Sequence, residues 1–429
     1  MKSKAAPALA ILFLVNVLNF YDRLALGAIL EPLRHEFQLS DTQLGALITW
    51  FTVVLALAGL PLGRLADRGS RRKLLAAGIA VWAGLTGLAA VAASYAMLLM
   101  TRLGVGIGEA VCAPVATSWI GDLVPAERRA RAMAGFMLAI PVGGLLSYSI
   151  TGPVAQVWGW RAALAIAAAP VFVLVPVVLW LNEPRRADPI AAPGVGGSGG
   201  LGDVLRVSGF WWIAASGAIV NFALYAFSTF MPAFLTRYHG ASVGRAGVWM
   251  GLGTGVSGIL GGAAVSAIGD RVRSRLGLAS IVSLIAAAPL FGALRAGSLL
   301  PAVLLAMAGY GLLQMYYGLV YAAIQDRFTP AMRATAMAAY LMVTYLGGAS
   351  WGPVATGKLS DVLARRAAGA GAITEAARAS GLHDAMYVIP ALAVILSVVL
   401  RLAARQSREE PPEPPLADAS VKKSGDIAG

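Results

Sequence analysis

Charged residues are scarce in this chain of 429 residues: they make up 13% of it, against about 25% in soluble globular proteins. That shortage excludes an ordinary soluble domain, because the charges cluster between apolar runs of about 20 residues, which are long enough to cross a bilayer. Cysteine is scarcer still. Cys112 is the only one, which excludes an intrachain disulfide and argues against redox chemistry.

Signatures of enzymes are missing as well. The histidines are His35, His239 and His383, and their positions near loops do not give the spacing of metal ligands. No phosphate-binding loop of the Walker type occurs, which argues against an ATP-driven pump. The sequence therefore predicts no enzyme activity, no metal and no cofactor.

Apolar runs and basic residues dominate what is present. Hydrophobic residues make up 58% of the chain, and the formal net charge is +13. Such a charge could indicate a nucleic-acid partner, but the basic residues recur at the ends of apolar runs, as in membrane proteins with positive cytoplasmic loops. We therefore expect no nucleic-acid partner and an all-α membrane protein with twelve spans, at residues 7–31, 42–66, 73–94, 96–121, 129–157, 159–181, 209–237, 243–268, 276–296, 298–325, 332–359 and 384–404.

Two polar segments organise the chain. Residues 182–208 contain NEPRRADP followed by GVGGSGGLG, a composition typical of a linker. We predict a six-helix bundle over residues 1–181, a cytoplasmic linker over 182–208 and a second six-helix bundle over 209–404. Residues 405–429, with PPEPP and VKKSGD, are too polar to pack and are expected to form a disordered cytoplasmic tail.

Basic residues also predict the orientation. They gather in the 2–3, 4–5 and 8–9 loops and in the linker, whereas the 3–4 and 5–6 connections carry almost none. Both termini are therefore expected in the cytoplasm. Residue usage suggests a bacterial inner membrane, and we expect a monomer among membrane lipids. The connection between spans 11 and 12 does not fit, because Arg365, Arg366 and Arg378 fall on the outer side and segment 364–383 has no assigned role.

A segment recurs in the two halves. DLVPAERRARAMAGFMLAIPVGG begins at Asp122, and DRFTPAMRATAMAAYLMVTYLGG begins at Asp326. The shared offset is 326 minus 122, or 204 residues, and it relates Asp122 to Asp326, Arg129 to Arg333, Met133 to Met337 and Gly143 to Gly347. Such a repeat indicates duplication, and many secondary transporters place their binding site between two repeated bundles.

The loop after the second span reads GRLADRGSRRK. It resembles the signature loop of the major facilitator superfamily, except that Ser70 replaces a second glycine; the matching residues are Gly63, Asp67, Arg68, Arg71 and Arg72. A carboxylate at such a helix end can bind backbone amides or an Arg of the other half, so we expect these residues to form a cytoplasmic gate. The alternative is a basic loop that serves only the orientation.

Charged side chains also lie inside two predicted spans. They are Asp22 and Arg23, with Asn16 and Asn19, in span 1, and Arg102 and Glu109 in span 4. Charges inside a membrane are costly, so these residues are expected to face a polar cavity. A carboxylate there can exchange a proton, and an Arg can hold a phosphate or carboxylate. The alternatives are contact of span 1 with lipid headgroups and a purely structural pair of Arg102 with Glu109.

Together these segments resemble the spinster family within the major facilitator superfamily. The resemblance runs from NFYDR through FQLSDTQLGALITWF, GRLADR and RLGVGIGEA to RARAMAGFMLAIPVGGLLSY and GWRAAL, most of the first half. It implies a transporter of amphipathic lipids such as sphingosine phosphate or lysophospholipids, working by alternating access. It also implies that Glu109, assisted by Asp22, exchanges a proton while Arg102 and Arg23 hold the anionic head of the substrate.

The second half offers polar-tipped side chains that would suit an amphipathic ligand: Asn221, Tyr225, Tyr316 and Tyr345. The alternative for each is an ordinary position facing lipid or packed between helices. No acid matching those of the first half lies inside the membrane part of spans 7 to 12, so proton coupling is expected in the first half. Two other interpretations of the chain stay open: a proton-coupled transporter of small organic anions or drugs, and a receptor or scaffold that binds without transport.

Overall fold

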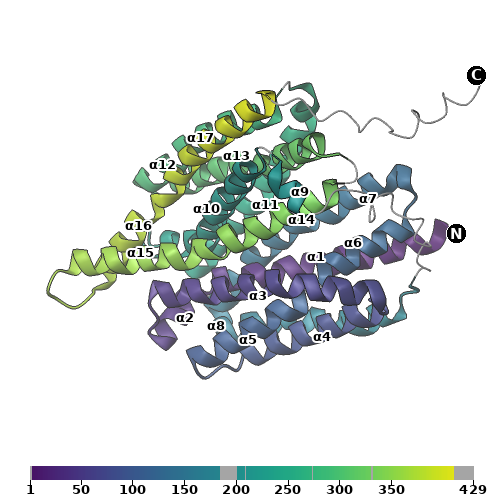
Figure 1. Cartoon of the computed structure of the whole chain (residues 1–429). Coiled ribbons are helices and arrows are strands. Elements are labelled where there is room, and N and C mark those ends of the chain that lie inside the picture. The colour runs from purple at the N-terminus through teal and green to yellow at the C-terminus, as the bar shows by residue number, and fades with distance from the viewer. Residues whose placement is uncertain (1, 184–200, 208, 273, 330–331, 410–429) are drawn as a thin grey trace, which may run out of the picture.

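The chain folds into a bundle of long helices (Figure 1). The computed structural model describes residues 2–183, 201–207, 209–272, 274–329 and 332–409, and no strand occurs within these ranges. The predicted tail over 405–429 falls outside them from residue 410 onward, and most of the predicted linker does too. The prediction of an all-α chain is confirmed within these ranges.

Helices α1 to α8 form the first half. Their bounds are α1 Lys2–Ala28, α2 Leu30–Phe37, α3 Asp41–Arg68, α4 Arg71–Ala89, α5 Tyr95–Glu109, α6 Cys112–Leu123, α7 Ala126–Met137 and α8 Ala139–Trp180. After the short α9, Leu201–Arg206, the second half contains α10 Phe210–Arg237, α11 Val243–Ile268, η1 Gly269–Arg271, α12 Arg275–Arg295, α13 Leu299–Arg327, α14 Arg333–Thr344, the π-helical η2 Tyr345–Ala349, α15 Trp351–Ala368, α16 Glu375–Met386 and α17 Val388–Glu409.

Ten helical segments of the described residues are long and apolar enough to cross a membrane. One of them, Arg131–Trp180, carries two predicted spans, because the backbone at Gly159 has φ 83° and divides α8 into two arms. A residue other than glycine is strained there. The eleventh predicted span, 332–359, is shared among α14, η2 and α15 and lies outside those ten. When the two arms of α8 are counted separately and the eleventh span is added, each of the twelve predicted spans corresponds to helices of the structure.

The connection between spans 11 and 12 consists of two helix extensions. Helix α15 continues to Ala368, so Arg365 and Arg366 lie in its last turn, where they complement the negative end of the helix dipole. Helix α16 then begins at Glu375, with the Thr374 side chain accepting from the Ala377 amide. The two form a hairpin that projects from one end of the molecule (Figure 1). The basic residues of segment 364–383 therefore belong to helix ends.

Serines mark where several spans begin. The hydroxyls of Ser40, Ser70, Ser94, Ser242 and Ser274 each accept a hydrogen bond from a backbone amide in the first turn of the helix that follows. A helix start leaves amides without partners inside the helix, and a serine at the cap position satisfies one of them. These caps explain why α3, α4, α5, α11 and α12 begin where they do.

The sequence repeat is accompanied by a repeated ion pair in the structure. Arg71 at the start of α4 donates to Asp122 of α6 over 2.5 Å. Arg275 at the start of α12 makes the same ion pair with Asp326 of α13. The two pairs are related by the same offset of 204 residues as the sequence repeat, since 275 minus 71 equals 326 minus 122. In each half, the start of the third span is therefore bonded to the end of the fourth span by the same kind of ion pair.

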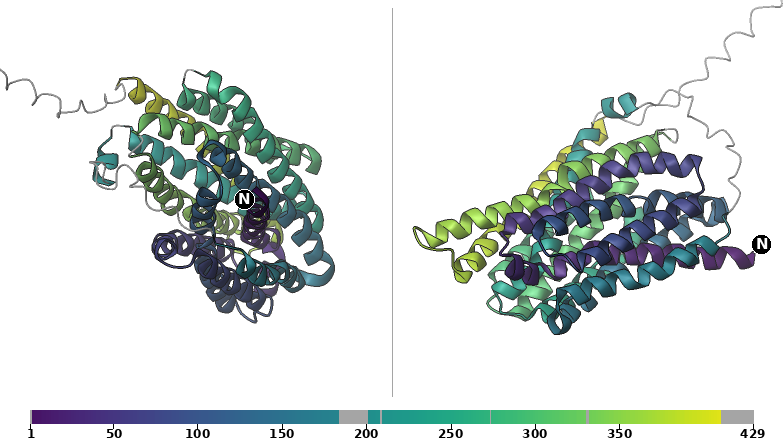
Figure 2. Two further views of the ribbon diagram at one scale, coloured as in Figure 1. Left: turned by 90° about the vertical axis from the view of Figure 1, so that its right-hand side faces the viewer. Right: turned by 90° about the horizontal axis from the view of Figure 1, so that it is seen from below.

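The halves touch most closely at one end of the bundle. We call this the far end, because the N-terminus and α7 lie at the other, the termini end (Figures 1 and 2). At the far end, a methyl group on Gly45 of α3 would collide with the backbone of Pro353 in α15. One on Gly357 of α15 would collide with the Asp41 carbonyl of α3. Only glycine permits this approach of two backbones.

Toward the termini end the same face of α3 is uncovered. Gly59 and Gly63 lie about four and five turns after Gly45, on nearly the same side of the helix. A methyl group on Gly59 would meet no described atom within 4 Å, and one on Gly63 only Pro114 of the first half, at 3.8 Å. Helix α3 therefore separates from the second half toward the termini end.

Candidate functional site in the helix bundle

Two ion pairs cross between α1 and α5 in the interior of the first half. Arg102 of α5 donates to Asp22 of α1 over 3.2 Å. Arg23 of α1 donates to Glu109 of α5 from two nitrogens, over 3.2 and 3.3 Å. Asp22, Arg102 and Glu109 are each only 1% exposed. The charged side chains singled out in these two spans therefore lie in the interior of the first half.

The observed pairing differs from the alternative in which Arg102 and Glu109 form an ion pair with each other. Arg102 and Glu109 share α5, but each is bonded to the neighbouring helix instead of to the other. Two turns of helix separate them by about 10 Å along the axis, which is too far for a direct pair. Asp22 and Arg23 are adjacent in α1, and each binds a different residue of α5. Helix spacing alone identified the residues but not their partners.

Aromatic rings and amides complete the surroundings of these charges. The Arg102 guanidinium lies 4.8 Å from the centroid of the Phe51 ring, and that of Arg23 lies 4.7 Å from the Phe20 ring. Both distances allow cation–π attraction. Arg23 also donates to the Asn19 amide oxygen over 3.1 Å. Asn16 instead donates to the Phe136 carbonyl, also at 3.1 Å, which ties α1 to α7.

Several polar atoms of this cluster have no hydrogen-bond partner within the described residues. They are Asp22 Oδ1, Glu109 Oε1, Asn19 Nδ2, and Nε and Nη2 of Arg102. Buried polar groups are normally paired, because each unpaired one costs desolvation free energy. Chemically, the unused guanidinium nitrogens can bind an anion and the unused carboxylate oxygens can take a proton.

Tyrosines of the second half face the first-half charges. Tyr225 of α10 and Tyr345 of η2 lie with ring centroids 6.3 Å apart, and both phenols are close enough to interact electrostatically with the Arg23 guanidinium. Tyr345 opens a π-helical turn, a local irregularity found often at functional sites. Arg23 therefore has charged and polar neighbours from both halves.

Other predicted second-half residues are tied into the helix packing. Asn221 donates to the Gly217 carbonyl over 2.9 Å and accepts from the Tyr317 hydroxyl over 2.9 Å. Tyr316 shares hydrogen bonds with Ser216 at 2.7 Å and with Tyr340 at 3.1 Å. For Tyr316, whose hydroxyl has two protein partners, the packing alternative describes these contacts well.

The signature loop is anchored within its own half. Arg71 is buried and binds Asp122, Ser118 and Glu183. Arg72 donates its amide to Glu183, Arg68 is exposed, and Gly63 faces Pro114. The side chain of Asp67 lies outside what the structure describes. The sequence did not single out Glu183, which accepts from the Ser70 hydroxyl over 2.7 Å and from the Arg71 amide over 2.9 Å.

A network of ionic contacts at the far end was missed by the sequence analysis. It joins α2 and the start of α3 to the far-end parts of α10, α15 and α16 through Glu31, Arg34, Asp41, Thr42, Arg237, Ser360, Asp361 and Glu375. These residues stand at the ends of spans, where headgroup contact is the default interpretation of a charge. The sequence did contain a signal: charged residues stand at span ends in the first half, and residues of opposite charge stand at span ends in the second half.

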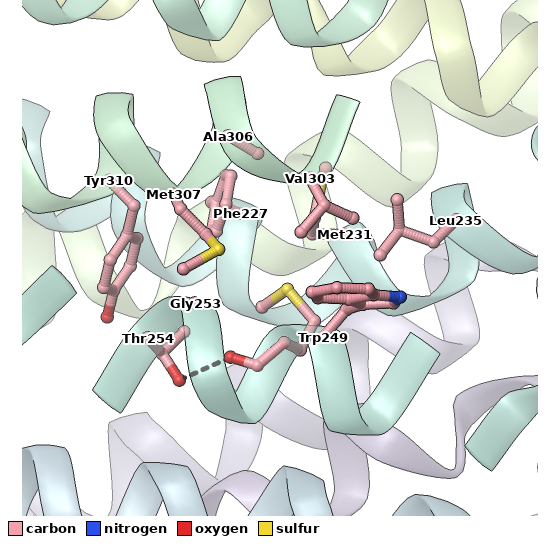
Figure 3. A pocket seen from close by; sticks show the side chains of 11 residues that line it. Phe227, Met231, Leu235, Trp249, Gly253, Thr254, Val303, Ala306, Met307 and Tyr310 are labelled. Carbon is pink, nitrogen blue, oxygen red and sulfur yellow. Dashed lines mark hydrogen bonds between the residues drawn. The ribbon is translucent and has the colours of Figure 1, made fainter. Parts of the chain in front are cut away.

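One small pocket lies away from the charges, within the second half. Figure 3 shows Met231, Trp249 and Met307 around it, with Thr254 donating to a backbone carbonyl below. Its volume of about 10 Å³ leaves room for about one water. The pocket is therefore too small to be a substrate-binding site.

Residues 12–353 match the model of the Major Facilitator Superfamily. The chain belongs to the major facilitator superfamily. Members of this superfamily are transporters, so the chain is an integral membrane transporter and no enzyme. A relative named as an MFS-type efflux pump, from Mycolicibacterium smegmatis, is 35% identical over 84% of this chain and 85% of its own length.

Spinster proteins are among the other relatives of this transporter. A solved structure described as a bacterial homologue of the human lysosomal transporter spinster, inward-facing and unoccupied, has a TM-score of 0.85 and 26% identity, covering 97% of this chain and 100% of its own. A sphingosine-1-phosphate transporter of Danio rerio is 29% identical over 54% of this chain and 47% of its own length. The spinster-like assignment made from the first-half motifs is confirmed.

Proposed function

We propose that this major facilitator protein is a proton-coupled transporter that moves an amphipathic anion by alternating access. The substrate class is a lipid with an anionic head, such as a lysophospholipid or a sphingosine-phosphate-like molecule. The observation that carries the proposal is the two buried ion pairs between α1 and α5, Asp22 with Arg102 and Arg23 with Glu109. Several polar atoms of these side chains have no hydrogen-bond partner within the described residues. Charges in such a place are a functional site by default.

Arg102 and Arg23 would hold the anionic head. Arg102 has two guanidinium nitrogens without protein partners, and a guanidinium binds phosphate or carboxylate through two parallel hydrogen bonds. Arg23 lies between Glu109 and the second-half tyrosines, so an anion there would contact both halves. Tyr225 and Tyr345 would pack against the substrate beside its head, with Asn221 and Tyr316 in supporting positions behind them.

Glu109 and Asp22 would exchange the proton. Each carboxylate currently neutralises an arginine. Protonation of Glu109 would remove its attraction for Arg23 and free that guanidinium for substrate. A substrate can shift a conformational equilibrium only by binding one state better, and an arginine that is free in one state and paired in the other provides that difference.

The setting follows from the charge pattern. We propose that the termini end faces the cytoplasm of a bacterial cell, in the inner membrane, and that the protein works as a monomer surrounded by lipid. Gly63, Asp67, Arg68, Arg71 and Arg72 would form the cytoplasmic gate. The buried Arg71 would keep the loop rigid while α3 and its partner separate and meet.

A second candidate is the efflux of small organic anions or drugs, which the relative named as an efflux pump favours. The same arginines would then bind a compact anion, and the tyrosines would pack on its aromatic part. A receptor or scaffold with this fold would bind either class of ligand without flux.

Flux into proteoliposomes separates these candidates. Wild type and Glu109→Gln would be given a fluorescent lysophospholipid, a small aromatic carboxylate and a cationic dye, each with and without a pH gradient. We expect gradient-stimulated flux of the lysophospholipid, with stimulation lost in Glu109→Gln. Flux of the carboxylate alone would support the second candidate, and saturable binding without flux would support a receptor. Unchanged stimulation in Glu109→Gln would remove the proton role of Glu109.

A further inference from the structure

The structure assigns a second latch to this protein, at the far end of the bundle: the carboxylate of Asp361 in the second half caps the first turn of α3 in the first half. This inference rests on the proposed alternating access, in which the far end must also open. Unlike the signature loop, this contact joins the two halves directly.

The cap satisfies amides that α3 cannot satisfy itself. Asp361 accepts from the Asp41 amide over 3.0 Å, from the Thr42 amide over 2.9 Å and from the Thr42 hydroxyl over 2.5 Å. The residue before the helix, Ser40, already accepts from the amide of Gln43. Ser40 and Asp361 thus divide the first three amides of α3 between them. An anion at a helix start also interacts favourably with the helix dipole.

A buried ionic cluster lies beside the cap and crosses the same interface. Arg237 of α10 binds both oxygens of Asp41, over 2.8 and 2.7 Å, and Glu31 over 2.7 Å. The side chains of Arg237 and Asp41 are each 3% exposed. The Ser360 hydroxyl, next to the capping residue, donates to Asp41 over 2.6 Å. Because the partners come from opposite halves, opening of the far end would break every one of these bonds.

A second arginine binds across the same gap. Arg34 of α2 donates to both oxygens of Glu375 at the start of α16, over 3.1 and 2.7 Å. Glu375 is more exposed than the cluster around Arg237, so water screens this pair more strongly. The Asp361 cap and the Arg237 cluster therefore dominate the latch.

The sequence around the cap parallels the signature loop. GRLAD, residues 63–67, ends α3 at the termini end, and GKLSD, residues 357–361, approaches the far end in α15. Gly357 is the glycine whose methyl group would collide with the Asp41 carbonyl. Glycine lets the two helix backbones meet, and an aspartate one turn later reaches the start of the partner helix. The parallel suggests one latch chemistry used at both ends of the bundle.

The test measures the distance between the halves at the far end in the full-length protein in nanodiscs. Spin labels would be placed at two exposed far-end positions, Ala93→Cys in the first half and Ala367→Cys in the second, with Cys112→Ser as background. Asp361→Asn keeps only one of the two acceptor oxygens and removes the negative charge, so we expect it to raise the ratio of long to short distances by about fivefold, the factor for about 1 kcal/mol of lost capping. Thr42→Val, which removes only the hydroxyl bond, should shift the ratio in the same direction by less.

Glu36→Gln is the matched control. Glu36 is an acid at the same end, but it binds Trp160 and Arg161 of its own half. Distances that stay at the wild-type ratio in Asp361→Asn, or that shift equally in Glu36→Gln, would overturn the latch. If Asp361→Asn does not fold, Thr42→Val decides the question. A shifted ratio without flux of any substrate would leave the latch standing and remove the transport proposal; flux without the shift would do the reverse.

Discussion

At the residue scale, the crossing of the two ion pairs is the central feature. Asp22 and Glu109 each hold an arginine of the neighbouring helix, so removal of one member leaves its partner as a buried uncompensated charge. The sequence could identify these residues, because charge inside an apolar run is rare. It could not give their partners, because partner choice depends on how far α1 and α5 are shifted along each other.

We predict that Arg102→Ala lowers the free energy of unfolding by about 3–5 kcal/mol, the usual cost of breaking a buried pair on one side. Adding Asp22→Asn to Arg102→Ala should recover a large part of the loss, because the stranded carboxylate is then gone. Thermal unfolding in detergent measures both variants. A double variant no more stable than Arg102→Ala would show that the two residues do not form a pair.

At the element scale, the start of α4 depends on a residue far along the chain. Burial by itself would raise the pKa of the Glu183 carboxyl, but hydrogen bonds from the Ser70 hydroxyl and from the Arg71 and Arg72 amides outweigh it, and the pKa lies below its ordinary value of 4.5. A lowered pKa in the folded state means that Glu183 stabilises the fold fully above pH 4.5. That contribution is lost as the pH falls through the lowered pKa.

Glu183→Gln should therefore cost about 1 kcal/mol at neutral pH, the usual value of a helix cap. The difference in Tm between this variant and wild type should shrink steadily below pH 4.5. Unfolding in detergent between pH 3 and pH 7 measures it. A difference that stays constant, or grows on acidification, would contradict the capping role.

Close packing between α3 and α15 gives a second prediction at this scale. Gly45→Ala should lower the free energy of unfolding by about 1–3 kcal/mol, as overpacking does, because the new methyl group meets the Pro353 backbone. Gly59→Ala, on nearly the same face of α3 but with nothing described within 4 Å, should change it by about 0.5 kcal/mol or less. Equal effects of the two substitutions would contradict the separation of α3 from the second half toward the termini end.

At the scale of the whole molecule, length and apolarity predicted the helices and the repeat predicted their duplication. The repeated sequence also makes a repeated contact, because the ion pair of Arg71 with Asp122 recurs as that of Arg275 with Asp326. The sequence could not indicate which end of the bundle is closed. That property depends on Arg237 meeting Asp41 and on Asp361 meeting α3, contacts between residues 196 or more positions apart. The sequence also left the structure of segment 364–383 open, and the structure shows that it contains the last turn of α15 and most of α16.

The central claim is that the buried charges line a path that opens at each end in turn. The most direct measurement places a single cysteine beside Arg23, as Tyr345→Cys with Cys112→Ser, and follows its reaction with a membrane-impermeant thiol reagent added to one side of the membrane at a time. The account predicts labelling from the termini side in wild-type background and additional labelling from the far side when Asp361→Asn is introduced. A cysteine that reacts from neither side, or from one side only in both backgrounds, would contradict it.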